Sequence, residues 1–351
     1  MPLAAAAAFA APPADDVPIK LGFDTYSLRA FKWNGMQLLD FAAEQKLDTI
    51  QFSALGDYGG LDAANLQKVK DRAAQLHITI DSGMGCICET SKSFNKRGRP
   101  AREQLLEGLR VSHAVGAKAM RCFLGSSEDR LNIEAHMETV VKLFRSVKSE
   151  AMDLGVKIAL ENHSGDMTAR ELRALILEAG KDYVGACMDA GNPLWCAEDP
   201  FVTLEILAPY TVTSHVRDSI VFETPHGAAG QWVAMGDGII DLPGWVAQFR
   251  RLCPWSSIQL EIITGRPPRM INYLDRDFWK AFPKMPAEDF ARFVALAKSG
   301  HPFLGTMVIE DAPGSKAPVM VDALKEQQRV DLVRSFEYCR KKLNIGVNWR
   351  G

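Results

Sequence analysis

The sequence predicts an α/β protein, a (β/α)8 TIM barrel with a long loop after the seventh strand and a C-terminal helical extension. From about residue 19 to residue 264, short apolar runs alternate with amphipathic helical stretches, which is typical of a parallel sheet. Eight strand-like runs occupy roughly 250 residues, a length that favours a closed barrel over an open sheet. The first run, near Gly22, lacks the G-x-G-x-x-G loop of a doubly wound nucleotide-binding sheet.

The expected strands are short apolar runs that suit burial on both faces of a sheet. In chain order they cover residues 19–23, 49–52, 78–81, 117–123, 156–161, 184–188, 212–216 and 258–262. Helical spacing of apolar residues predicts helices over about 36–44, 62–75, 101–113, 132–153, 169–179, 243–252, 287–298 and 322–343. Thr168 and Glu171 form a capping box that starts one of these helices, and Gly180 ends it. Another helix should begin at Pro200, because Asp199 is a good N-cap.

The chain is expected to form one domain, residues 18–351. Residues 19–264 make the barrel, and residues 265–351 decorate its mouth and wall. Residues 1–17 are mostly alanine and proline without Lys or Arg, so they predict a disordered leader or the remnant of an export signal. The compartment is therefore left open between the cytoplasm and, if the leader is such a remnant, the periplasm.

Composition narrows the class of protein. The 41 Lys and Arg residues nearly balance the 43 Asp and Glu residues, and a formal net charge of −2 argues against a nucleic-acid partner. No apolar run approaches the ~20 residues of a membrane-spanning helix, so no membrane partner is expected. The seven cysteines are odd in number, which argues against a disulfide framework, and Cys122 and Cys187 are expected as small buried side chains in strands.

The four late strands share one feature, because each ends in an acidic residue or a histidine. Glu161 ends the fifth strand, Asp189 the sixth, His215 the seventh and Glu261 the eighth. The first two gaps are 28 and 26 residues, close to one barrel repeat of roughly 30 residues, and the third, 46 residues, is one repeat plus the long loop. We therefore expect the four side chains on the same rim of the barrel, at the same height.

The predicted meeting of three carboxylates and an imidazole indicates a metal ion. Carboxylates that converge in a cleft raise one another's pKa, and burial makes their ionisation costlier still. A divalent cation resolves this conflict, and four matching positions favour a metal site over four separate loop anchors or salt bridges. Oxygen-rich ligation with one histidine favours Mn²⁺, Mg²⁺ or Co²⁺ over structural Zn²⁺. The prediction is one divalent ion, with Mn²⁺ preferred and Mg²⁺, Co²⁺ or Zn²⁺ as alternatives.

These strand ends resemble those of the xylose isomerase-like barrel superfamily, which includes sugar and ketose epimerases, inosose dehydratases and hydroxypyruvate isomerases. The segments that carry the resemblance are Leu160-Glu161-Asn162-His163, Asp189-Ala190-Gly191-Asn192, His215-Val216-Arg217-Asp218 and Leu260-Glu261. The resemblance covers about residues 19–264. It implies that Glu161, Asp189, His215 and Glu261 are the metal ligands, and that Glu161 and Glu261 also form the acid–base pair flanking the substrate carbon.

Two departures from that superfamily affect the expected reaction. Asn192 stands where many ketose epimerases carry a histidine, and the tail after the eighth strand is longer than in compact epimerases. The tail and the long loop look more like those of proteins that act on larger glycosides, including deglycosidases and lyases that cleave 3-keto-glycosides.

The predicted function is that of a divalent-metal-dependent sugar isomerase or epimerase, which abstracts a proton next to a carbonyl and forms a metal-stabilised enediolate. Return of the proton to the opposite face is epimerisation, and its return to the neighbouring carbon is isomerisation. Loss of a β-substituent is elimination. The alternative is therefore a lyase, hydratase or deglycosidase that acts on 3-keto sugars or their glycosides at the same metal site.

Further residues near the strand ends are candidates for proton transfer and substrate contact. His163 is either a catalytic proton shuttle or a hydrogen-bonded rim histidine. Arg217 either fixes a substrate hydroxyl or carboxylate or pairs with a neighbouring acid. Asn192 either binds substrate or holds its own turn, and Trp232 either packs on a sugar face or anchors the loop. Arg121 either lines the cleft or pairs with a carboxylate at the rim.

Two other classes are less well supported by the sequence. An abasic-site endonuclease of the same fold would need several zinc ions held by many histidines, but four of the seven histidines lie away from the late strand ends. A catalytically silent barrel would not be expected to fill all four ligand positions. The expected partners are a small carbohydrate substrate and further copies of the chain, since barrels of this type often pair through their helices.

Overall fold

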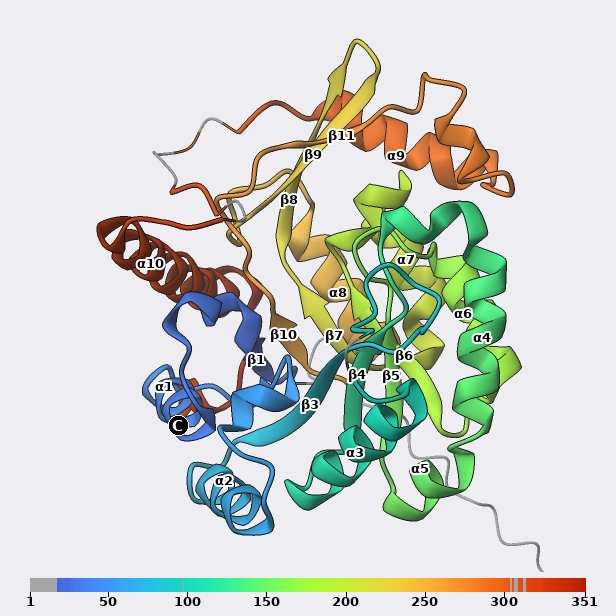
Figure 1. Ribbon diagram of the computed structural model, residues 1–351. Coiled ribbons are helices and arrows are strands. Elements are labelled where there is room, and N and C mark those ends of the chain that lie inside the picture. The colour runs from blue at the N-terminus through green and yellow to red at the C-terminus, as the bar shows by residue number, and fades with distance from the viewer. Residues whose placement is uncertain (1–17, 97, 304, 306–308, 312–313) are drawn as a thin grey trace, which may run out of the picture.

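The computed structural model describes residues 18–96, 98–303, 305, 309–311 and 314–351. Eight parallel strands close into a barrel in the order β1-β10-β7-β6-β5-β4-β3-β2, and helices cover its outer wall (Figure 1). The predicted TIM barrel is confirmed. The predicted leader, residues 1–17, lies outside the described residues. None of the described helices is both long and apolar enough to cross a bilayer.

The barrel strands are short, and most of their residues are buried, as parallel strands under a layer of helices require. They are β1 (Leu21–Asp24), β2 (Thr49–Gln51), β3 (Thr79–Cys86), β4 (Ala119–Phe123), β5 (Lys157–Glu161), β6 (Val184–Asp189), β7 (Thr211–Val216) and β10 (Ile258–Leu260). A second sheet contains β8 (Asp218–Thr224), β9 (Gly227–Val233) and β11 (Arg269–Ile271). The helices are α1 (Gly35–Glu44), α2 (Ala63–Gln75), α3 (Ala101–Ala114), α4 (Ile133–Arg145), α5 (Lys148–Leu154), α6 (Ala169–Ala179), α7 (Pro200–Leu207), α8 (Leu242–Leu252), α9 (Ala287–Ser299) and α10 (Pro318–Leu343).

The helix predicted over residues 132–153 is two helices, α4 and α5. Ser146 donates its hydroxyl to the carbonyl of Leu143 at 2.7 Å, a bond that competes with the helical ladder. Val147 then leaves the helical conformation, and α5 starts after it. The helix starts predicted at Thr168 and Asp199 are confirmed, since both side chains cap their helices.

The sequence predicted a long loop after the seventh strand, over about residues 220–238. This prediction is corrected, because most of that segment is a β-hairpin. Strands β8 and β9 pair antiparallel, and β11 adds to the edge of β9 above the barrel mouth (Figure 1). Ala228, Ala229 and Gly230 have low β propensity, which hid β9 in the sequence. The small size of Gly230 has a packing reason, since a Cβ there would lie 2.9 Å from the ring of Trp195.

Helix α10 is part of the barrel wall and not only decoration. Leu332, Phe336 and Cys339 belong to the main hydrophobic core. The ring of Phe336 packs edge-on against Phe23 of β1, with centroids 6.1 Å apart. Because α10 also contacts α8, it takes the place of the eighth barrel helix, although β11 and α9 come before it in the chain.

The buried carboxylate of Asp48 ties the C-terminus to the start of β1. It accepts hydrogen bonds from the backbone N–H groups of Leu21 at 2.8 Å, Val347 at 2.9 Å and Asn348 at 2.6 Å. Three donors from two distant parts of the chain thus share one side chain, and each would be left without a partner if that side chain were removed.

Replacing Asp48 should therefore cost much more stability than removing an exposed helix cap. We expect Asp48→Ala to lower the free energy of unfolding by about 3 kcal/mol, because buried donors are left unpaired. The matched control is Asp62→Ala, which removes the N-cap of α2 on the surface and should cost about 1 kcal/mol. Urea denaturation of both variants measures the difference, and equal losses would show that the tether contributes nothing beyond a cap.

Candidate metal centre

The four side chains predicted to share one rim meet at the C-terminal end of the barrel. Glu161, Asp189, His215 and Glu261 each offer one ligand atom, and these atoms all lie within 4.8 Å of one another. The strand register sets Asp189 of β6 beside His215 of β7. All four residues are buried. The strand ends predicted this meeting because parallel strands of a closed barrel finish at the same edge.

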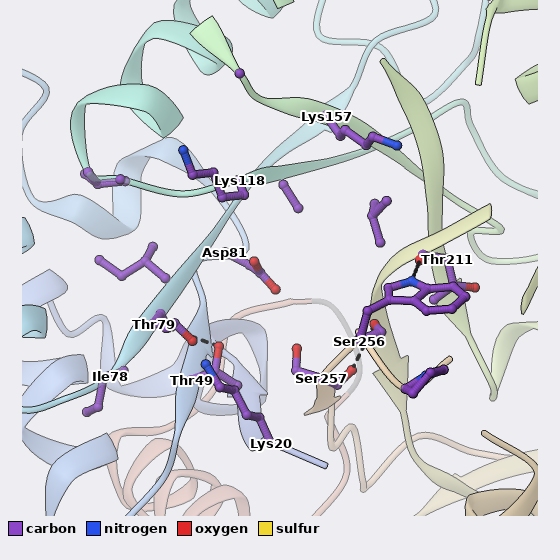
Figure 2. A pocket seen from close by; sticks show the side chains of 18 of the residues that line it. Lys20, Thr49, Ile78, Thr79, Asp81, Lys118, Lys157, Thr211, Ser256 and Ser257 are labelled. Atoms are coloured by element: carbon purple, nitrogen blue, oxygen red, sulfur yellow. Dashed lines mark hydrogen bonds between the residues drawn. The ribbon is translucent and has the colours of Figure 1, made fainter. Parts of the chain in front are cut away.

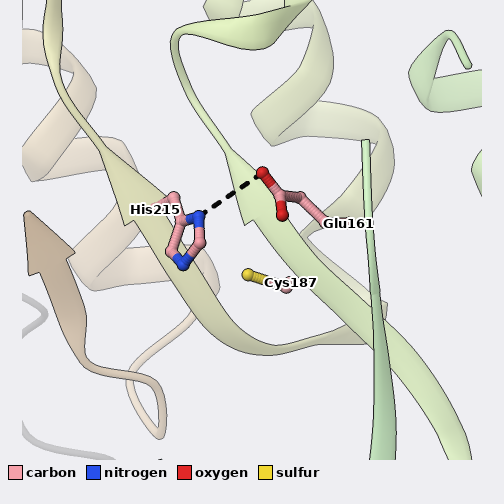
Figure 3. Close-up of side chains that lie close together, drawn as sticks. All are labelled: Glu161, Cys187 and His215. Carbon is pink, nitrogen blue, oxygen red and sulfur yellow. Dashed lines mark ion pairs between the residues drawn. The ribbon is translucent and has the colours of Figure 1, made fainter. Parts of the chain in front are cut away.

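The imidazole of His215 turns one nitrogen to the carboxylates and the other to the barrel interior. Nδ1 lies 3.4 Å from Glu161 Oε1, 3.9 Å from Asp189 Oδ2 and 3.5 Å from Glu261 Oε2, and it forms no hydrogen bond. Figure 3 shows the approach of His215 to Glu161. On the other side, Nε2 lies 3.4 Å from Asp24 Oδ2. A buried nitrogen without a partner that faces three carboxylates is suited to bind a cation, with an acid behind it to orient the ring.

Two buried arginines compensate part of the negative charge. Arg121 donates from Nε to Glu161 Oε2 at 2.5 Å. Arg217 contacts both Asp189 and Glu261 through Nη2, while its Nε and Nη1 have no hydrogen-bond partner. Of the two interpretations open for each arginine from the sequence, the structure shows pairing with carboxylates.

The remaining charge fits a divalent ion. Four buried carboxylates, those of Asp24, Glu161, Asp189 and Glu261, surround His215 and face two guanidinium groups. With the imidazole neutral, as a metal ligand must be, two negative charges stay uncompensated, and an unpaired charge is costly to bury. A divalent cation would neutralise them. Carboxylate oxygens with one imidazole nitrogen form a donor set that suits Mg²⁺, Mn²⁺ or Co²⁺.

The pKa values of the cluster reflect this crowding. Burial alone would raise the pKa of Glu161, but the charge of Arg121 lowers it to about 2. Burial raises the pKa of Asp189 to about 6, although Arg217 opposes the shift. Burial would lower the pKa of His215, but the thiol and carboxylates around it raise that pKa well above its ordinary value. A cation that binds here would therefore displace protons from the cluster.

Two asparagines hold the carboxylates in place. Asn162 exchanges two hydrogen bonds of 2.9 Å with the backbone N–H and carbonyl of Asp189. Asp189 Oδ1 accepts the N–H groups of Gly191 at 2.6 Å and Asn192 at 2.7 Å, which leaves Oδ2 facing the centre. Asn192 donates from Nδ2 to Glu161 Oε1 at 3.1 Å, and its own Oδ1 is buried without a partner.

His163 and Trp232 border the cluster. His163 Nδ1 contacts the carbonyl of Gly125 at 2.7 Å, and its ring stacks on Phe123 with centroids 3.9 Å apart. Trp232 donates from Nε1 to a backbone carbonyl after β6 at 3.1 Å. The guanidinium of Arg217 lies 4.3 Å from the centroid of the Trp232 ring. These contacts anchor both side chains at the mouth, and their roles in proton transfer and sugar binding stay predictions.

Three inward side chains of the site were missed in the sequence. Asp24 ends β1 as Glu161 ends β5, so the strand-end rule would have found it had it been applied to the early strands. Gln51 ends β2 and contacts His215 Nε2. Cys187 lies within ligand range of Glu161 and His215 (Figure 3). Burial raises the pKa of its thiol to about 11, so Cys187 is a poorer ligand than the carboxylates.

Known proteins share this architecture. A family model described as "Xylose isomerase-like TIM barrel" matches residues 39–262. A 3-oxo-isoapionate decarboxylase from Pectobacterium atrosepticum is 23% identical over 234 residues, which are 63% of this chain and 77% of that protein. A D-psicose 3-epimerase solved in the presence of D-fructose has a TM-score of 0.60 at 14% identity and covers 93% of this chain and 99% of its own. The IOLI protein with a bound zinc atom has a TM-score of 0.56 at 15% identity and covers 80% of this chain and 100% of its own.

Loss of one carboxylate from the cluster should weaken cation binding. We expect wild-type protein to bind one Mn²⁺ per chain and Glu161→Gln to bind it roughly tenfold or more weakly, because a charged ligand becomes neutral. Calorimetric titration gives both affinities. The matched control is Glu198→Gln, an equally buried glutamate that bonds Thr203 and the backbone of Ala169, and it should bind as wild type does. Wild-type affinity in Glu161→Gln would rule out its assignment as a ligand.

Proposed function

The chain belongs to the xylose isomerase-like TIM barrel family, and on that basis we propose that it is a divalent-metal-dependent sugar isomerase or epimerase. The observation that carries the proposal is the unpartnered Nδ1 of His215, which faces three carboxylates within a buried cluster. The proposed ligands are Glu161, Asp189, His215 and Glu261. The proposed ion is Mn²⁺, with Mg²⁺, Co²⁺ or Zn²⁺ as alternatives, since the oxygen-rich set suits several divalent ions.

A bound divalent ion would stabilise negative charge that develops on the substrate oxygens, a contribution of several kcal/mol. Proton abstraction and return are assigned to carboxylates of the chain itself. Glu261 Oε2 contacts Arg217, whereas Glu261 Oε1 accepts no hydrogen bond within the described part of the chain, and the residue is 6% exposed. We assign Oε1 as the atom that takes the proton next to the substrate carbonyl.

Glu161 is the proposed partner that returns a proton on the other side of the substrate carbon. Both of its oxygens are already held, Oε1 by Asn192 and Oε2 by Arg121. Proton return from Glu161 therefore requires one of these contacts to give way when a sugar binds. His163, stacked beside the cluster, is the alternative proton carrier, with Nε2 as the nitrogen not engaged by the backbone.

The hydrogen bonds that occupy both oxygens of Glu161 favour a second candidate function. This function is that of a lyase or deglycosidase acting on 3-keto sugars or their glycosides. One free carboxylate is sufficient for proton abstraction followed by loss of a β-substituent, whereas epimerisation needs a donor on each face. The relative that decarboxylates 3-oxo-isoapionate and the ketose epimerase support a carbohydrate with a carbonyl group as the substrate class. Trp232 is the proposed surface for the apolar face of such a sugar.

Solvent exchange separates the two candidates. In D₂O with saturating Mn²⁺, we expect a ketose substrate to gain deuterium at carbon with its skeleton and substituents intact, detected by mass spectrometry and NMR. Release of water or an aglycone from a 3-keto-glycoside would instead establish the lyase. A protein that binds Mn²⁺ and does neither on a broad panel of keto-sugars would contradict both candidates.

The proton-accepting role of Glu261 predicts a loss of rate that added metal cannot restore. We expect Glu261→Gln to reduce turnover by roughly 10²–10⁴-fold at saturating Mn²⁺, because general base catalysis is removed. Glu198→Gln is again the control and should retain wild-type turnover. Recovery of the Glu261→Gln rate at high Mn²⁺ would show that this residue only holds the ion.

A further inference from the structure

Beneath the metal centre, polar side chains continue through the inside of the barrel, although inward positions there could have been apolar. Gln51 of β2, Thr213 of β7 and Gln259 of β10 are fully buried. Gln51 and Thr213 connect His215, at the C-terminal end, with Asp81 of β3, near the opposite end, and Gln259 also bonds Asp81. Buried polar groups are costly unless they are paired, so a continuous chain of them calls for a reason.

The row of buried polar side chains ends at Asp81, which faces an open space. Asp81 points into a cavity of about 1240 Å³ at the N-terminal mouth of the barrel, beside Lys20, Thr49 and Thr79 (Figure 2). Its Oδ2 atom accepts hydrogen bonds from Thr213 Oγ1 at 2.7 Å and from Gln259 Nε2 at 3.2 Å.

The hydroxyl of Thr213 sets the direction of the hydrogen bonds. It lies 2.7 Å from Asp81 Oδ2 and 3.1 Å from Gln51 Oε1, but it has one hydrogen to donate. A carboxylate is the nearer and stronger acceptor, so the hydrogen goes to Asp81. The lone pairs of Thr213 then face Gln51 and need a donor there.

The orientation of the Gln51 amide links the hydrogen bond of Thr213 to the protonation of His215. A half-turn about its last side-chain bond exchanges the amide oxygen and nitrogen. In the present orientation the amide nitrogen contacts His215 Nε2 and donates to Asp24 Oδ2 at 3.3 Å, and the half-turn gives up that bond. The nitrogen then donates to Thr213, and the amide oxygen faces His215 Nε2 beside Asp24 Oδ2. An acceptor opposite Nε2 requires a proton on that nitrogen, and Asp24 Oδ2, 3.4 Å from Nε2, favours the same proton. The other ring nitrogen, Nδ1, then keeps a free lone pair toward the carboxylates when the ring is neutral.

We propose that Asp81 is a positioning residue that acts through Thr213 and Gln51 to keep a proton on His215 Nε2, so that Nδ1 is free to bind a cation. This inference rests on the proposed function, in which His215 is a ligand. It adds that affinity for the ion is set partly at the opposite end of the barrel, by a residue that does not touch the ion.

Four variants test the chain of hydrogen bonds. Thr213→Val removes the hydroxyl at nearly constant shape, and Thr213→Ser restores it. Asp81→Asn keeps the size of the side chain but allows it to donate as well as accept. Thr211→Val is the matched control, because Thr211 lies on the same strand and bonds the carbonyl of Leu207 instead.

Two readouts are measured on each variant. The first is the dissociation constant for Mn²⁺, by calorimetry. The second is the Nε2–H proton of His215 in metal-free protein labelled with ¹⁵N-histidine, identified by its loss in His215→Asn. Burial raises the pKa of Asp81, and its bond from Thr213 opposes that shift. Spectra are therefore recorded over a pH series that extends to the alkaline side of neutrality, because a higher pH favours ionisation of this carboxyl group.

We expect Thr213→Val and Asp81→Asn to weaken Mn²⁺ binding by about threefold to tenfold, less than for a group that bonds a ligand directly. In both, the Nε2–H resonance should move upfield and exchange faster with solvent, because its acceptor is no longer fixed. Thr213→Ser and Thr211→Val should match wild type in both readouts. If the wild-type protein binds no divalent ion but the Nε2–H proton responds as expected, the proposed function fails and the hydrogen-bond chain stands. If Thr213→Val leaves the Nε2–H proton and the affinity unchanged, the inference is overturned.

Discussion

The structure depends most on the crowding of four carboxylates around one buried histidine. Carboxylates that close to one another in a buried site would take up protons or move apart unless cations held them. Arg121 and Arg217 supply part of that compensation, and a divalent ion is the simplest source of the rest. The neighbouring contacts, from the Asn162 bonds around Asp189 to the acid behind His215 Nε2, keep these groups facing a common centre.

The same constraint links the centre to the mouth of the barrel. Arg217 contacts two carboxylates of the cluster and also lies on the ring of Trp232, which belongs to the sheet above the mouth. Trp232 in turn packs edge-on against Trp195, with centroids 5.2 Å apart. A cation that replaced the contacts of Arg217 would free its guanidinium to meet a substrate under Trp232. The substrate role predicted for Arg217 and the salt bridges seen in the structure are therefore compatible as two states of one side chain.

The sequence was sufficient for the barrel and for the four residues of the cluster, for a physical reason. Strand ends in a closed parallel barrel are forced to one rim, so residue type at each strand end carries spatial information. Pairing between side chains is not encoded in this way. Nothing near Arg217 in the chain indicates that it reaches Asp189 and Glu261, or that Gln51 reaches His215. The hairpin was missed because Ala228, Ala229 and Gly230 have low β propensity, and at Gly230 the closeness of the Trp195 ring leaves no room for a side chain.

The central claim is that Glu161, Asp189, His215 and Glu261 hold a single divalent cation. The most direct measurement is anomalous diffraction from crystals soaked in Mn²⁺. We predict one strong anomalous peak between these four side chains, with His215 Nδ1 as the nitrogen ligand and Arg217 withdrawn from at least one of its two carboxylates. Fully soaked crystals with no peak at that position, and with both Arg217 contacts intact, would contradict the claim.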